Sequence, residues 1–127
     1  MLRPKPEAHA ASAEDAVLTK AVVRAADHLG VTSKSLSAII GVSEATVSRM
    51  RRQDFQLERG SKPFELGVLF VRLFRSLDAI TGGDEAVSKA WIRNPNRALE
   101  ATPLEKILTI AGLLDVIAYL DTSRALV

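Results

Sequence analysis

Apolar residues recur at helical spacing over most of the chain, and this pattern predicts an all-α protein. One helix is expected over residues 14–29 and another over residues 64–80, beyond the helix breakers Gly60 and Pro63. The stripe expected to be buried on the first helix is Val17, Leu18, Ala21, Val22, Ala25 and Leu29. No run alternates with period two and no Asn-Gly or Asp-Gly pair marks a hairpin, so strands are not expected.

Residues 36–52 predict two short helices joined by a tight turn. Gly41 is placed to end the first helix in a left-handed conformation, and Ser43 is placed to cap the second. The inward-facing apolar positions lie three or four residues apart within each helix: Leu36, Ile39, Ile40, Val47 and Met50. This pattern is typical of a helix-turn-helix whose reading helix spans residues 44–52. An αα-hairpin packed for stability alone would give the same spacing.

Positive charge gathers on the predicted reading helix although the whole chain has a net charge of only +2. Residues 49–59 contain four arginines (49, 51, 52 and 59) but only two acids, Asp54 and Glu58. Residues 61–127, in contrast, carry eight basic and eight acidic groups. Such a bias suits a phosphate-contacting surface. A solvated charged face is the alternative interpretation.

The helix-turn-helix motif would place six residues towards the major groove, and these are the candidate DNA-contacting residues: Ser43, Glu44, Thr46, Ser48, Arg49 and Arg52. Arg49 or Arg52 is suited to bidentate pairing with guanine, whereas the hydroxyl groups of Ser43 and Thr46 are suited to phosphate. Glu44 would accept from a cytosine amine or interact with the helix dipole.

The C-terminal half contains a second informative stretch. A short helix is expected after Asp84, with Ala86, Val87, Ala90 and Trp91 on its inner face. Asn94-Pro95-Asn96 indicates a turn, and Thr102-Pro103-Leu104-Glu105 has the form of a capping box. The helix that this box would begin, residues 103–120, is apolar on nearly every side and needs more than one neighbour to bury it. Either a partner chain or the other helices of the same chain would cover it.

These patterns divide the chain into a flexible arm (1–13), a helix-turn-helix domain (14–75) and a second helical domain (76–127). No cysteine occurs, no apolar run approaches the roughly 18 residues of a membrane span, and the first residues lack the order of a signal peptide. A cytoplasmic, non-membrane protein is therefore expected. The sequence has no metal-ligand cluster and no phosphate-cradling glycine loop, so we expect no enzyme activity, no metal and no cofactor.

Two motifs carry a resemblance to a known family, over roughly residues 15–122. Gly41-Val42-Ser43 followed by Val47-Ser48-Arg49 resembles the core of Xre/Cro-type repressors. Trp91, Asn94-Pro95-Asn96, Ala98-Leu99 and Thr102-Pro103-Leu104 resemble, in this order, the toxin-binding domain of Xre/MbcA/ParS antitoxins. The sequence departs from that family at Ala101, where a glycine is common. Residues 121–127 do not resemble the longer tail that some members carry, so contacts through such a tail are less expected.

The resemblance implies a homodimeric antitoxin that neutralises a RES-domain toxin and represses its own operon. Such toxins are associated with NAD⁺ degradation or ADP-ribosyl transfer, so NAD⁺ would be the toxin's substrate and not a cofactor of this chain. Two-fold symmetry would imply a palindromic operator with half-sites about one helical turn apart. The residues expected to bind the toxin or form the dimer are Trp91, Leu104, Ile107, Leu108, Leu114, Tyr119 and Arg124.

Arg124 is the only cation in the C-terminal segment 121–127, which is expected to be mobile enough to enter a partner's cleft. Two other classes of protein fit the same residues. A stand-alone, dimeric repressor of the phage type would need the same DNA module and use the second domain for dimerisation only. An interaction protein with a vestigial DNA module is less consistent with the arginines on the reading helix.

Overall fold

The computed structural model describes residues 13–125, and this part of the chain is helical without any strand. The helices are α2 (Ala13–Leu29), α3 (Ser33–Ile40), α4 (Glu44–Arg51), α5 (Lys62–Thr81), α6 (Glu85–Arg93), α7 (Pro103–Lys106) and α8 (Ile110–Ala125). The all-α prediction is confirmed. The expected arm, residues 1–13, lies outside the described residues except for Ala13, which begins α2. No helix within residues 13–125 is long and apolar enough to cross a membrane.

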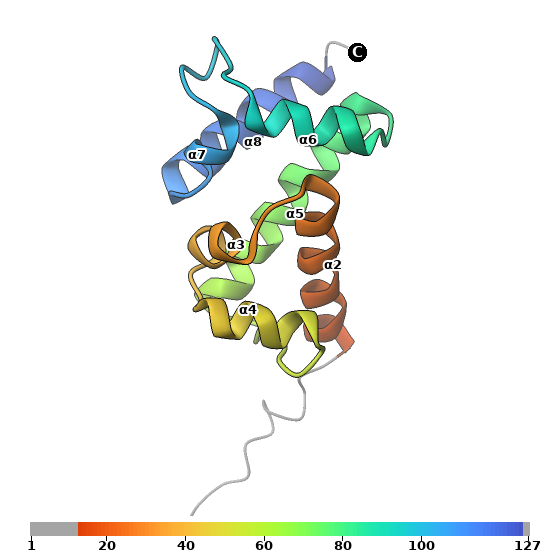
Figure 1. Ribbon diagram of the computed structural model, residues 1–127, viewed down its shortest axis with the longest axis vertical. Coiled ribbons are helices and arrows are strands. Elements are labelled where there is room, and N and C mark those ends of the chain that lie inside the picture. The colour runs from red at the N-terminus through yellow and green to blue at the C-terminus, as the bar shows by residue number, and fades with distance from the viewer. Residues whose placement is uncertain (1–12, 126–127) are drawn as a thin grey trace, which may run out of the picture.

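Helix α5 joins the two halves of the molecule (Figure 1). Helices α2 and α3 pack against it on the side of the helix-turn-helix, and α8 packs against it in the other half. The buried apolar residues of both halves form one continuous cluster, with Phe70, Leu73 and Leu77 of α5 fully buried within it. The boundary expected between residues 75 and 76 thus falls inside α5, so the two halves share a helix and a core.

Capping residues define the start of α3 and both ends of α5. Thr32 Oγ1 accepts a hydrogen bond from the Ser35 N–H at 3.1 Å and begins α3. Ser61 Oγ accepts from the Phe64 N–H at 3.3 Å, and Pro63 lies in the first turn of α5, where a missing N–H does no harm. Gly82, with a φ of 65°, ends α5 in the left-handed conformation.

The prediction of a single helix over residues 103–120 is wrong, because the helix is interrupted between α7 and α8. The Gly112 N–H donates to Thr109 Oγ1 at 3.1 Å, so Thr109 caps a new helix at this point. Thr102 precedes α7 with Pro103 in the first turn, as expected, but its side chain makes no cap hydrogen bond. Helix α8 then continues to Ala125, so residues 121–125 are not the mobile end that was expected.

The structure also corrects which residues are buried on α2 and α6. On α6 the buried residues are Ser88 and Ile92, and the side chain of Val87, expected inside, is 49% exposed. On α2 the side chain of Val17, expected in the buried stripe, is 68% exposed, whereas Val22 and Leu29 are buried as expected. Both errors arise because an apolar residue next to a buried stripe is indistinguishable from a member of it until the neighbouring helix is placed.

Candidate nucleic-acid and partner interfaces

The turn between α3 and α4 has the geometry expected of a helix-turn-helix. Gly41 has a φ of 74° and donates its N–H to the Ser37 carbonyl at 2.9 Å. The Thr46 N–H donates to Ser43 Oγ at 3.0 Å, which begins α4. Val47 and Met50 are buried beneath α4 and fix its inward face. The opposite face of α4 is therefore presented to solvent.

The six candidate DNA-contacting residues differ in how free their side chains are. Glu44, Arg49 and Arg52 are exposed, and Thr46 and Ser48 are half-buried. Ser43 is exposed, but its hydroxyl group donates to Thr46 Oγ1 at 2.9 Å in addition to capping α4. A phosphate that binds these hydroxyl groups would compete with the hydrogen bond between Ser43 and Thr46. The DNA contacts themselves stay predictions.

The arginines in and just after α4 have three different environments, which sequence alone did not distinguish. Arg51 turns inward, where it donates to Ser33 Oγ at 3.1 Å and pairs with Asp27. Arg52 Nε lies 3.4 Å from Asp54 Oδ2. The Arg49 guanidinium lies over the Phe55 ring, 5.1 Å from its centroid, and has no acidic partner among residues 13–125. Arg49 is therefore the cation of α4 that remains electrostatically unpaired.

The turn between α2 and α3 is held from both halves of the molecule. The side chain of Arg51 on α4 reaches the Val31 carbonyl at 3.5 Å. From the other half, Arg93 on α6 donates to the Leu29 carbonyl at 2.9 Å and to the Gly30 carbonyl. The Leu29 and Gly30 carbonyls lie at the C-terminal end of α2, where helical partners are missing and the dipole favours a cation. The same turn thus connects the reading helix with the C-terminal half.

A second contact between the halves is formed by His28 at the end of α2. Its Nε2 lies 3.6 Å from Asp78 Oδ1 and its Nδ1 lies 4.0 Å from Glu85 Oε2. The ring meets the Phe74 ring edge-on at a centroid distance of 5.0 Å. Lys89 Nζ, 2.6 Å from Glu85 Oε1, lowers the pKa of Glu85 from its ordinary value by hydrogen bonding and by its charge.

The break between α7 and α8 leaves a group of apolar side chains uncovered. Leu108 is 40% exposed, Ile110 is 58% exposed and Leu114 is 48% exposed. The opposite side of α8, including Leu113, Val116, Ile117 and Leu120, is buried in the core. The helices within residues 13–125 therefore cover only one side of α8. We call Leu108, Ile110 and Leu114 the α8 patch.

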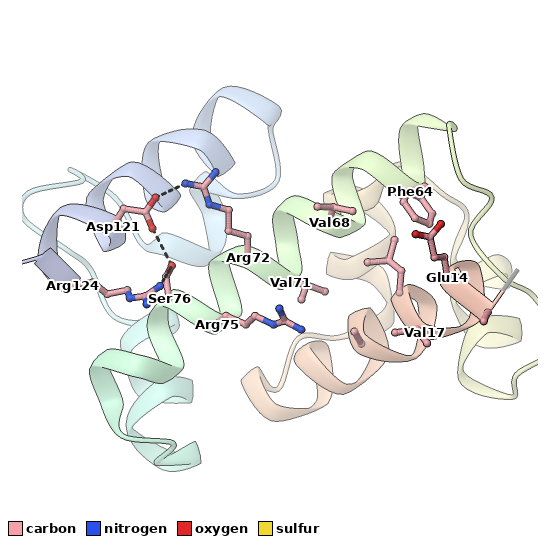
Figure 2. A pocket seen from close by; sticks show the side chains of 13 residues that line it. Glu14, Val17, Phe64, Val68, Val71, Arg72, Arg75, Ser76, Asp121 and Arg124 are labelled. Atoms are coloured by element: carbon pink, nitrogen blue, oxygen red, sulfur yellow. Dashed lines mark hydrogen bonds and ion pairs between the residues drawn. The ribbon is translucent and has the colours of Figure 1, made fainter.

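The other residues expected to bind a partner are scattered around the C-terminal half. Ile107 is buried in the core, so it cannot contact a partner in this conformation. Trp91 and Tyr119 are half-buried and stack on each other with ring centroids 6.3 Å apart, and Leu104 is half-buried beside the core. Arg124 lies next to α5, where it donates to Ser76 Oγ at 3.4 Å (Figure 2).

The molecule is a helix-turn-helix protein with a second helical domain. The first part is defined by the capped turn and the exposed reading helix, and the second part exposes the apolar α8 patch. Family models identify both parts: residues 8–72 match the antitoxin Xre-like helix-turn-helix domain, and residues 76–125 match the antitoxin Xre/MbcA/ParS C-terminal toxin-binding domain. The chain belongs to the Xre/MbcA/ParS antitoxin family. Neither domain family is enzymatic, in agreement with the prediction that the chain is not an enzyme. No curated protein matches the chain in sequence.

Sequence reasoning missed the most exposed apolar residue of the patch, Ile110, and the structural role of Arg51. Ile110 looked like one of many apolar residues inside a long helix, because the cap at Thr109 was not recognised. Arg51 looked like its neighbours Arg49 and Arg52. Its position one residue after the buried Met50 is the only signal in the sequence, and that signal is weak without the position of Asp27.

Proposed function

We propose that the chain is a homodimeric antitoxin that binds and neutralises a cognate RES-domain toxin in the cytoplasm. Membership of the antitoxin family supports a toxin partner, and the motifs around Trp91 and Pro103 support the choice of a RES-domain toxin. On this proposal the toxin consumes NAD⁺, and the chain itself needs no cofactor.

The observation that carries the proposal is the α8 patch. Leu108, Ile110 and Leu114 lie in the segment matched to the toxin-binding domain, and each is more than a third exposed. Burying large apolar side chains is the main driving force for protein association. An uncharged apolar patch is suited both to contact with a second copy of the chain and to contact with a toxin.

We further propose that the dimer represses its own operon through α4. The guanidinium of Arg49, which has no acidic partner among residues 13–125, and the exposed side chain of Arg52 support contact with a major groove. Two symmetry-related copies of α4 would read a palindromic operator with half-sites about one helical turn apart.

Co-expression with the product of the neighbouring reading frame tests the proposal. Each protein is produced alone and both together, growth is recorded, and the products are separated by size exclusion with light scattering. We expect growth arrest from the neighbour alone, relief by this chain, and a stable complex that contains a dimer of it. Absence of both toxicity and complex would overturn the antitoxin role and leave a stand-alone repressor.

Leu114→Asp is expected to weaken dimer or toxin binding at least tenfold. Leu114 is 48% exposed, so the isolated fold should tolerate the change, whereas an interface would lose an apolar contact of about 1.5–3 kcal/mol and bury a charge. Light scattering measures the dimer and calorimetric titration measures toxin affinity. Leu114→Met, which keeps the apolar surface, is the control. Unchanged dimer and toxin affinities for Leu114→Asp would contradict the role of the α8 patch.

A further inference from the structure

A groove runs between α2 and α5 and ends at the last turn of α8 (Figure 2). It encloses about 790 Å³, and a smaller hollow of about 440 Å³ continues from it along α2. Both hollows are lined by Val17, Ala21, Val71 and Arg75, so they form one surface. Most of this surface lies outside residues 76–125, the segment matched to the toxin-binding domain.

The floor of the groove is apolar, and two of its residues are exposed. Val17 on α2 is 68% exposed and Val68 on α5 is 44% exposed, with Phe64 and Val71 beside them (Figure 2). From Phe64 to Ser76, α5 presents about 18 Å of helix to the groove. That length matches about three turns of a helix lying between α2 and α5.

The smaller hollow, which continues the groove along α2, is cationic. Lys20, Arg24 and Arg75 line the smaller hollow without any acidic residue in its lining, and none of the three has an acidic partner among residues 13–125. At the other end, Arg72 is paired with Asp121 at 2.5 Å, and this carboxylate also accepts from Ser76 at 3.0 Å (Figure 2).

The other acidic residue in the lining, Glu14, is paired with Arg59 at 2.6 Å. Both acids of the groove are thus already paired, whereas the three cations of the smaller hollow lie beside the apolar floor without an acidic partner among residues 13–125. This combination favours an occupant that is apolar on one face and acidic at its edges.

Charge argues against two other occupants, and the apolar floor argues against a third. A second copy docked by the same face would set cation against cation, whereas the uncharged α8 patch has no such penalty. Residues 1–12 carry Arg3 and Lys5 against one acid, Glu7, so their charge has the wrong sign. A DNA backbone would satisfy the cations but would leave Val17 and Val68 without an apolar partner.

We propose that this groove docks an acidic amphipathic helix of the toxin, as a second contact separate from the α8 patch. The inference rests on the proposed function, because it takes the toxin as the partner. The toxin would then be held by the helix-turn-helix half as well as by the C-terminal half of the chain.

The test is a titration of the purified full-length chain with the product of the neighbouring reading frame, at low and high salt. Two groove variants are compared with wild type: Lys20→Glu combined with Arg75→Glu, and Val17→Asp. The controls are Arg75→Lys, which keeps the charge, and Lys62→Glu, which reverses an exposed cation outside the groove. Circular dichroism checks that each variant is folded.

We expect both groove variants to weaken toxin binding about tenfold or more at low salt, with a smaller loss for the charge variant at high salt, because salt screens exposed charges. The two controls should bind as wild type does. Normal toxin binding by the groove variants, with loss of binding only in Leu114→Asp, would overturn the groove as a docking site but leave the antitoxin function intact.

Two further outcomes are decisive. If the groove variants keep toxin binding and instead lose affinity for DNA from their own promoter, the groove contacts phosphate and the proposal is wrong. If the wild-type chain binds no toxin, the proposed function fails and this inference fails with it. The wild-type titration thus separates failure of the function from failure of the groove.

Discussion

Replacing Gly112 with alanine is expected to lower the free energy of unfolding by about 3 kcal/mol and the melting temperature by about 10 °C. A Cβ atom at this position would overlap the carbonyl oxygen of Lys106 and lie 2.6 Å from its carbonyl carbon. Those atoms belong to the backbone at the end of α7, so no side-chain rotation relieves the overlap. The corner between α7 and α8 would have to open.

The sign of this effect also decides between two structures for residues 103–120. In the continuous helix suggested by the sequence pattern, alanine would be favoured over glycine by about 1 kcal/mol, and the variant would be more stable. In the broken helix it must be less stable. Urea unfolding followed by circular dichroism gives the answer, with Ala111→Ser as the control because Ala111 is exposed at the adjacent position. Stabilisation by Gly112→Ala would contradict the corner.

The corner also positions the α8 patch. Leu108 lies in the connection between the two helices, and Ile110 begins the second one. Opening the corner would therefore move Leu108 relative to Ile110 and Leu114, which lie together on α8. We expect Gly112→Ala to weaken partner binding as well, even at temperatures where the protein remains folded.

The helix-turn-helix could be predicted from sequence because its determinants are local. Gly41 and Ser43 act on backbone groups within four residues of themselves, and the structure contains both of the conformations that they indicate. The inward faces of α3 and α4 followed equally well from the spacing of Leu36, Val47 and Met50, all of which are buried.

The C-terminal half was less predictable because its shape depends on contacts between distant residues. Its apolar residues are so dense that periodicity could not show which face of α8 meets α5, or that Thr109 interrupts the helix. The position of Arg124 depended on Ser76, 48 residues earlier. Likewise, the apolar pattern predicts that Val17 is buried, because the sequence cannot show how far along α2 the contact with α5 extends.

The three arginines at residues 49–52 offer the sharpest test of the proposed DNA surface, since each variant removes the same charge. Arg49→Ala is expected to lower operator affinity by about 1–3 kcal/mol, because its guanidinium is unpaired and held over Phe55, ready to contact a base. Arg52→Ala should lower affinity less, because Asp54 already competes for this cation. The two substitutions combined should abolish binding without unfolding the chain.

Arg51→Ala is the matched control. Its side chain is 28% exposed and holds Asp27 and Ser33, so its loss should lower the free energy of unfolding by about 1–3 kcal/mol. The folded fraction should still bind the operator with nearly wild-type affinity. Fluorescence anisotropy with promoter DNA at several salt concentrations measures all four variants, alongside chemical unfolding. Equal losses of affinity for Arg49→Ala and Arg51→Ala would mean that net charge, rather than the geometry of α4, controls operator binding.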